Sequence, residues 1–174
     1  LRKGYFFIKT FRHFEPLKLA IHSLIQKQAP TFNLKDSSSE WIDLRSFKGG
    51  WLVLFYYPKD DTPGCTKEVC HFRDNYSLIK SMGVSIVGIS LDDSASHKKF
   101  TAKHNLPFML LSDPQGIVAE AYGTLFKFLC IKLAKRHSFI IDPKGLVRKE
   151  YRSVNPLTHS NQIMEDLKVL QSQK

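Results

Sequence analysis

The chain has 174 residues, 43% of them hydrophobic, a length that suits one compact domain. No apolar stretch approaches the length of a membrane span, so a transmembrane helix is not expected. The three cysteines are odd in number and too few for a disulfide scaffold. Free thiols favour a reducing compartment, and we therefore expect a cytoplasmic location.

The positive charge of the chain is concentrated near its start. The formal net charge is +10, and the first 28 residues contribute six Lys or Arg against one Glu. We interpret residues 1–27 as a basic, flexible or leader-like extension and residues 28–174 as the folded domain. The extension lacks the uninterrupted apolar core of a secretory signal. A transit leader, and with it an organelle, remains the alternative, as does binding to nucleic acid or to an anionic membrane surface.

Strand and helix patterns alternate through the rest of the chain, which predicts an α/β fold. We expect a central, mostly parallel sheet, helices on both of its faces and an N-terminal β-hairpin. The expected elements are strands over 29–34 and 41–44 paired as a hairpin, a strand over 51–57, a helix over 66–76, a strand over 84–90, a helix from Asp93 or Ser94 to His104, a strand over 108–111, a helix over 113–122, a hairpin of strands over 138–141 and 146–151, and a closing helix over 157–170.

One cysteine lies where a predicted strand meets a predicted helix. Cys65 follows the run Pro58-Lys-Asp-Asp-Thr-Pro-Gly64, in which Pro63 and Gly64 break the chain before the helix. At a helix N-terminus, unpaired N–H groups and the positive end of the helix dipole stabilise a thiolate. We therefore predict that Cys65 is a nucleophile, with the Thr62 hydroxyl close to its sulfur.

The residues around Cys65 carry a family resemblance. The spacing Pro58-x-x-x-Thr62-x-x-Cys65 resembles the peroxidatic motif of the peroxiredoxins, the AhpC/TSA family. The longer string over 55–70 is similar to the peroxiredoxin Q branch, also called bacterioferritin comigratory protein, and the likeness extends from about Gln28 to Leu170. It implies a thioredoxin-like fold and an antioxidant thiol peroxidase that reduces hydrogen peroxide and organic hydroperoxides.

Peroxide reduction needs particular groups around the sulfur. A thiolate attacks one oxygen while negative charge develops on the other, so N–H groups or a cation must surround both. The Thr62 hydroxyl and the backbone N–H groups of Gly64 and Cys65 can supply part of this substrate-binding set, and Pro58 can shield the sulfur from water. Arg136 is our candidate for the cation, because the family's arginine stands two residues before the Ser or Thr of the following strand. Lys135, Arg73 and Arg148 are alternatives, and a surface cation is the other interpretation of Arg136.

The resemblance also implies a second redox residue and a reductant. Cys70 would resolve the sulfenic acid on Cys65 as an intramolecular disulfide, which thioredoxin or a glutaredoxin-like dithiol would reduce. In one regular helix the two Cα atoms would be about 8.6 Å apart, whereas a disulfide needs about 7 Å or less, so we expect the first helical turns to unwind. A buried, non-redox Cys70 is the alternative. No metal, haem or flavin is implied, and we expect a monomer.

The remaining cysteine and several histidines receive structural interpretations. Cys130 lies within 125–133, and we interpret it as a core or interface residue, with a redox partner as the alternative. The apolar and basic segment between Gly123 and Arg136 that contains it is shorter than the Gly-rich, polar loop of the relatives. We interpret His71, His97 and His104 as exposed helix residues. The C-x4-C spacing lacks a second pair of ligands, so a zinc site is not expected.

Two other functions compete with peroxide reduction. A thiol-disulfide oxidoreductase or chaperone on the same fold would use a C-x-x-C motif, which this chain lacks. A protein that binds nucleic acid or a membrane surface would rely on the basic extension, and its binding would weaken steeply with salt. Nucleic-acid binding is the less favoured interpretation.

Overall fold

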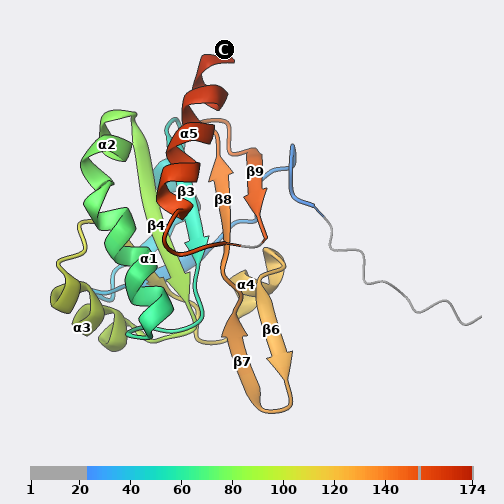
Figure 1. Ribbon diagram of the computed structural model, residues 1–174. Helices are drawn as coiled ribbons and strands as arrows, with labels where there is room; N and C mark the ends of the chain where they lie inside the picture. Colours follow the sequence, from blue (N-terminus) through green and yellow to red (C-terminus); the bar gives the residue numbers. More distant parts are fainter. Residues whose placement is uncertain (1–22, 153, 174) are drawn as a thin grey trace, which may run out of the picture.

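The computed structural model describes residues 23–152 and 154–173, so the first 22 residues of the expected extension lie outside it. A seven-stranded sheet forms its centre (Figure 1), in the order β2-β1-β5-β4-β3-β8-β9. The strands of this sheet are β1 (Asn33–Asp36), β2 (Trp41–Asp43), β3 (Trp51–Tyr56), β4 (Val84–Ser90), β5 (Met109–Ser112), β8 (His137–Ile141) and β9 (Val147–Tyr151).

The sheet is mixed, and our expectation of a mostly parallel sheet was wrong on this point. Only the β3–β4 and β4–β5 pairs are parallel, because helical crossovers connect these three strands. The β1–β2 and β8–β9 pairs are hairpins, and β1 and β8 join the central strands antiparallel. The α/β class, the flanking helices and the N-terminal hairpin are confirmed.

Both faces of the sheet are buried, and the central strand β3 shows why. Its residues alternate between two apolar clusters, with Val53 and Phe55 in one and Leu54 and Tyr56 in the other. Helices α1, α2 and α5 contribute to the first cluster, and α4 contributes to the second. A strand covered on both faces reads as a continuous apolar run, which is the pattern of 51–57.

The helices are α1 (Pro63–Asp74), α2 (Tyr76–Ser81), α3 (Ser94–His104), α4 (Ile117–Ala121) and α5 (His159–Ser172), with a 3-10 turn η1 (Leu44–Phe47). Asp93 caps α3 as expected, accepting a hydrogen bond from the Ser96 N–H at 2.8 Å. Helix α4 is shorter than the expected 113–122, because Gly116 is left-handed at φ 74° and delays its start. The Asp113 carboxylate still binds the Ile117 and Ala119 N–H groups.

Two further strands lie outside the main sheet and were not expected. Strands β6 (Leu125–Phe128) and β7 (Ile131–Ala134) form an antiparallel hairpin that extends away from the body (Figure 1). Cys130 is exposed in its turn, so a place in the core, one of our interpretations of this cysteine, was wrong. Cys130 is exposed because no other described segment covers that end of the hairpin. Within the described residues, no helix combines the length and apolar composition that crossing a bilayer requires.

The backbone already pairs with the body before the expected start of the domain at Gln28. The Gln26 N–H donates to the Val147 carbonyl at 2.8 Å, and the Val147 N–H donates to the Lys27 carbonyl at 2.9 Å. Gln28 itself forms a β-bridge with Leu146. The residues just before Gln28 therefore extend the edge of the sheet beside β9.

Candidate active site

Cys65 lies at the start of α1, directly after the loop that leaves β3. Thr62 is the N-cap in an extended conformation, Pro63 is the first helical residue, and Cys65 follows two residues later. Proline suits this position because its missing N–H has no intrahelical partner there. The sulfur-bearing residue is only 1% exposed, and the free N–H groups of the first turn face this end of the helix.

Arg136 contacts the sulfur of Cys65. Strand β8 pairs antiparallel with β3, with Tyr56 opposite His137, so the residue just before β8 lies where β3 ends. The Arg136 Nη2 donates to the Cys65 Sγ at 3.3 Å. A Cβ added to Gly64 would lie 3.3 Å from the same Nη2, so the glycine leaves room for the guanidinium.

Glu68 holds the other side of the guanidinium, and the sequence analysis missed it. It lies three residues after Cys65 on α1, is fully buried, and accepts a hydrogen bond from the Arg136 Nη1. Burial raises the pKa of Glu68 to about 7, although the charge of Arg136 opposes this rise. Burial lowers the pKa of Arg136, but Glu68 and Cys65 raise it by more. The i, i+3 spacing from Cys65 was the signal in the sequence that could have identified Glu68.

The other candidate cations lie elsewhere. Arg73 pairs with Asp74 and donates to the His104 carbonyl, and Arg148 pairs with Asp142. The Lys135 side chain is exposed. Of the four cations considered, Arg136 is the one with a hydrogen bond to the Cys65 sulfur.

His159 is a buried, neutral histidine close enough to Arg136 to be affected by its charge. Its Nε2 is 2.8 Å from the Ser138 Oγ, and its ring packs edge-on against Phe72 and Tyr151. Burial lowers the pKa of His159 to about 4, and the nearby charge of Arg136 contributes in the same direction.

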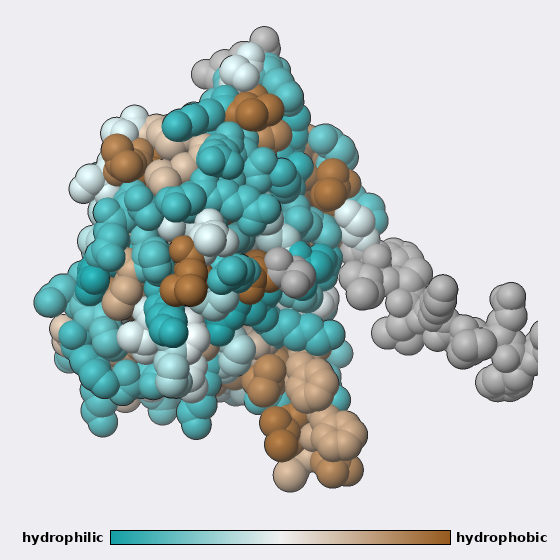
Figure 2. All heavy atoms as spheres, viewed as in Figure 1, coloured by the Kyte–Doolittle hydropathy of each residue, from teal (hydrophilic) through white to brown (hydrophobic). Residues whose placement is uncertain are grey.

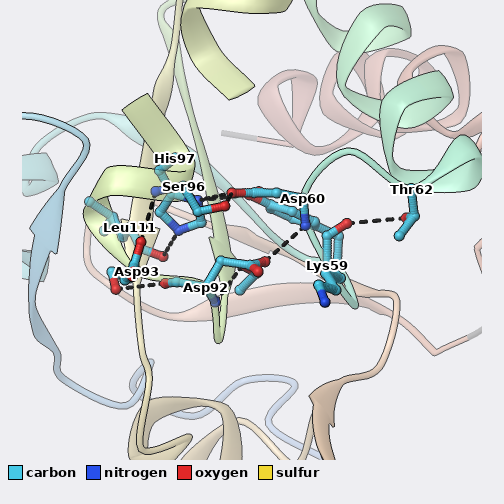
Figure 3. Close-up of polar contacts among 11 residues, drawn as sticks. Lys59, Asp60, Thr62, Asp92, Asp93, Ser96, His97 and Leu111 are labelled. Atoms are coloured by element: carbon cyan, nitrogen blue, oxygen red, sulfur yellow. Dashed lines mark hydrogen bonds and ion pairs between the residues drawn. The ribbon is translucent and has the colours of Figure 1, made fainter. Parts of the chain in front are cut away.

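A buried polar network holds the loop between β3 and α1 (Figure 3). The Asp60 carboxylate accepts hydrogen bonds from Tyr57 and Ser96, each at 2.7 Å, and its Oδ2 is 2.9 Å from the His97 Nδ1. The Asp60 N–H donates to Asp92 at 2.8 Å. Burial raises the pKa of Asp60, but the bonds and charge of His97, with Tyr57 and Ser96, lower it below its ordinary value.

His97 is therefore not an exposed helix residue, and that interpretation was wrong. It is fully buried, and its Nε2 is 3.2 Å from the Leu111 carbonyl while its Nδ1 faces Asp60. Each ring nitrogen thus lies within hydrogen-bond distance of an oxygen atom, which ties α3 to the loop after β3 and to β5. His71 and His104 are half-buried instead of exposed, because each lies on a helix face that meets the body.

Two further predicted site residues lie near the helix start without a hydrogen bond to the sulfur. The Thr62 hydroxyl donates to the Lys59 carbonyl at 3.1 Å and thereby closes the loop (Figure 3). Pro58 is half-buried at the end of β3. Both belong to the loop that the Asp60 network anchors, so their positions relative to Cys65 depend on that network.

Cys70 lies in the same helix as Cys65, and both are free thiols. Cys70 is half-buried, and its sulfur is 3.9 Å from the His104 Nδ1. Two cysteines five residues apart in one helix point in different directions and cannot form a disulfide without a local rearrangement. Among the residues described, no cluster of three or more His, Cys, Asp or Glu could hold a metal ion.

Residues 25–150 match the model of the AhpC/TSA family. The chain belongs to the AhpC/TSA family. Over 151 residues this AhpC/TSA protein is 41% identical to the chloroplastic peroxiredoxin Q of Oryza sativa subsp. japonica, covering 83% of the chain but only 65% of the rice protein. Over 154 residues it is 38% identical to peroxiredoxin Bcp of Bacillus subtilis, covering 83% of the chain and 94% of that relative.

Solved structures of similar proteins share the fold of this AhpC/TSA family member. Peroxidoxin BcpB from Mycobacterium tuberculosis superposes with a TM-score of 0.81 at 33% identity, covering 86% of this chain and 99% of its own. The bacterioferritin comigratory protein of Xanthomonas campestris, whose structures address its alkyl peroxide reduction activity, superposes with a TM-score of 0.76 at 30% identity. The match covers 80% of this chain and 91% of that one. The resemblance to peroxiredoxin Q and the thioredoxin-like fold are thus confirmed.

Because their pKa values are shifted in opposite directions, Glu68 and His159 change the stability of the fold in opposite directions as the pH falls. Glu68 binds its proton more tightly in the folded protein than in the unfolded chain. Its contribution to stability is therefore fully present at a pH below its ordinary pKa of 4.5 and is lost as the pH rises through about 7. His159 binds its proton less tightly in the folded protein than in the unfolded chain. Its contribution to stability is therefore fully present at a pH above its ordinary pKa of 6.5 and is lost as the pH falls through about 4.

We therefore expect His159→Gln to lose less stability than the wild type on acidification from pH 7 to 4.5, and Glu68→Gln to lose more. Each difference should reach about 3 kcal/mol at most, since one pKa unit corresponds to about 1.4 kcal/mol. Urea unfolding at several pH values measures both, with His71→Gln on α1 as the control. Equal acid sensitivity of all four proteins would contradict these assignments.

Proposed function

We propose that this protein is a thiol peroxidase that reduces hydrogen peroxide and organic hydroperoxides through Cys65. The observation that carries the proposal is the hydrogen bond from the Arg136 guanidinium to the Cys65 sulfur at the N-terminus of α1. A fixed cation and free N–H groups favour a thiolate and then stabilise the negative charge that develops on the departing oxygen. Membership of the AhpC/TSA family and the alkyl peroxide reduction addressed in the Xanthomonas relative support the same chemistry.

The first step converts Cys65 to a sulfenic acid. The thiolate attacks one peroxide oxygen, an S–O bond forms, and the O–O bond breaks. The departing oxygen leaves as hydroxide or alkoxide and takes a proton from water. The Thr62 hydroxyl and the N–H groups of Gly64 and Cys65 would bind the peroxide, and Pro58 would limit access of water. Glu68 would act as a positioning residue, because it pairs with one arm of Arg136 and leaves the other arm for the sulfur.

The second step would regenerate the enzyme. The Cys70 thiol condenses with the sulfenic acid, releasing water and forming the Cys65–Cys70 disulfide. A dithiol protein of the thioredoxin or glutaredoxin type would then reduce this disulfide by thiol exchange. No group besides these thiols is needed for the electron balance, since each turnover consumes two electrons from the dithiol.

The location and the assembly of the protein stay predictions. We propose a cytoplasmic monomer, with an organelle as the alternative if residues 1–27 act as a transit leader. Chloroplastic relatives from plants and a bacterial relative are similar to this chain to a comparable extent. Residues 28–174 would form the catalytic domain, joined by the short segment that pairs beside β9.

Substitution of each cysteine should separate the two steps. We expect Cys65→Ser to abolish peroxide reduction, and Cys70→Ser to complete one stoichiometric turnover and then stop as a sulfenic acid that is open to overoxidation. Dimedone labelling with intact mass analysis distinguishes these states, and Cys130→Ser is the matched control. Full thioredoxin-dependent turnover by Cys70→Ser would reject Cys70 as the resolving residue and direct attention to Cys130.

Loss of the guanidinium should lower the rate at which Cys65 reacts with peroxide. Arg136→Gln should decrease kcat/KM by about 10²–10³-fold, the usual effect of removing one preorganised donor from a developing oxyanion. Arg148→Gln is the control, because Arg148 pairs with Asp142 away from the sulfur. The measurement is single-turnover oxidation in a stopped-flow instrument. A variant Arg136→Gln as fast as the control would remove the central support for the proposal.

Disulfide formation should require the first turns of α1 to unwind. Amide exchange of residues 65–72 should therefore be faster in the oxidised protein than in the reduced one. Lys67 is exposed on α1, so Lys67→Gly should weaken the helix and speed disulfide formation without removing a buried contact. Lys98→Gly on the exposed face of α3 is the matched control. Identical exchange protection of residues 65–72 in both redox states would rule this mechanism out.

A further inference from the structure

The β6–β7 hairpin carries an unusual distribution of side chains. Its cross-strand register places Phe126 opposite Leu133 and Phe128 opposite Ile131. Residues two apart on a strand share a face, so these four apolar residues line one face of the hairpin. The other face has Lys127 opposite Lys132 near the end and Leu125 opposite Ala134 at the base.

The base of the hairpin is held by the body, whereas its end is not. Ala134 is buried, and Leu125 packs against the apolar cluster that includes Tyr122. The turn and its neighbours, Phe128–Ile131, form what we call the hairpin tip. Figure 2 shows the hairpin projecting from the body with apolar residues gathered toward its end.

The hairpin tip exposes more apolar surface than folding requires. Phe128 is 60% exposed, Leu129 is 90% exposed and Ile131 is 54% exposed. Single exposed apolar residues are common, but a contiguous group indicates a binding surface. The tip projects from the body (Figure 2), a shape that suits insertion into a lipid surface better than contact with a flat protein surface.

Leu129 adds a cost in backbone conformation. It is the first residue of a two-residue turn and has φ of 52°, which places it in the left-handed region. Asn and Gly are preferred at such positions, and a bulky residue there is strained. A leucine that is 90% exposed buries little apolar surface that could offset this cost. Strain of this kind points to a function outside the folded body.

The charges around the tip indicate the chemistry of the partner. Residues 121–135 include three cations and no Asp or Glu, within a chain of net charge +10. Lys127 pairs with Glu120 at 3.0 Å, but both side chains are about half-exposed or more, so this pair is weak. Lysines beside an apolar tip complement the phosphates of anionic lipids. The three cations are Lys127, Lys132 and Lys135.

We propose that the hairpin tip inserts into the surface of anionic phospholipid membranes and holds the protein there reversibly. The apolar side chains would enter the boundary between headgroups and acyl chains, and the lysines would remain at the level of the phosphates. A second copy packed on the apolar face would leave Lys127 and Lys132, which lie on the opposite face, without a partner on that copy, whereas an anionic membrane surface engages both the apolar tip and the lysines. Nucleic acid would bind the cations but would leave the apolar tip exposed.

Flotation of the full chain with lipid vesicles tests the proposal. We expect binding to phosphatidylcholine vesicles with about one third phosphatidylglycerol, and little binding to phosphatidylcholine alone. Leu129→Asn should reduce the partition coefficient at least about tenfold. It should also keep or raise the stability of the fold, since Asn tolerates a positive φ. Lys132→Gln should weaken binding and its salt dependence.

Matched controls separate the hairpin from the rest of the surface. Leu78→Asn changes a leucine that is 59% exposed on α2, and Lys98→Gln changes an exposed lysine on α3, and neither should alter binding. An environment-sensitive dye on Cys130, in a Cys65→Ser, Cys70→Ser background, should shift to shorter emission wavelength on binding.

Three results would overturn the proposal. The first is equal vesicle binding by wild type and Leu129→Asn, which would assign the binding to the basic extension. The second is vesicle binding without a shift of the dye on Cys130. The third is a wild-type dimer that Leu129→Asn dissociates, with no vesicle binding by either protein, which would make the tip a contact between copies.

Discussion

The buried pair of Arg136 and Glu68 is the interaction on which the candidate site depends. An arginine within a protein is costly unless its charge is compensated, and Glu68 supplies that compensation from the helix that carries Cys65. One carboxylate thus links the start of β8 to α1 and orients the guanidinium. The free arm of the guanidinium then reaches the sulfur at 3.3 Å. Removal of Arg136 would leave the fully buried Glu68 carboxylate without its cation, and removal of Glu68 would leave the guanidinium without the group that orients it.

A second buried network, around Asp60 and His97, controls the loop on the other side of Cys65. This loop carries Pro58 and Thr62, and its backbone is held by Asp92. The two networks approach Cys65 from different elements, one from β8 and α1, the other from α3 and the end of β4. Packed apolar clusters on both faces of the sheet keep these elements in register. Cys65, the proposed nucleophile, therefore lies where several packed elements meet, an arrangement that maintains the geometry of a site.

The proposed membrane contact lies on an element with little connection to this framework. In the part of the chain that the structure describes, the β6–β7 hairpin pairs with no strand of the main sheet, so its tip can change in sequence without disturbing the core. The base of the hairpin, however, ends at Ala134, and Arg136 follows two residues later. The hairpin tip, which ends at Ile131, and Arg136 are thus only five residues apart in the chain, and the buried Ala134 lies between them.

Local patterns in the sequence determined much of this protein: the order of strands and helices, the cap of α3 by Asp93, the position of Cys65 at a helix start, and Arg136 through its family resemblance. These features depend on neighbours in the chain, which a sequence displays directly. Tertiary structure alone decided the mixed sheet, because strand direction depends on how distant segments pair. It also decided the burial of His97 and the role of Glu68, because their partners lie 37 and 68 residues away. The exposure of the hairpin tip was decided in the same way, since an apolar run looks alike whether or not the fold provides a surface to cover it.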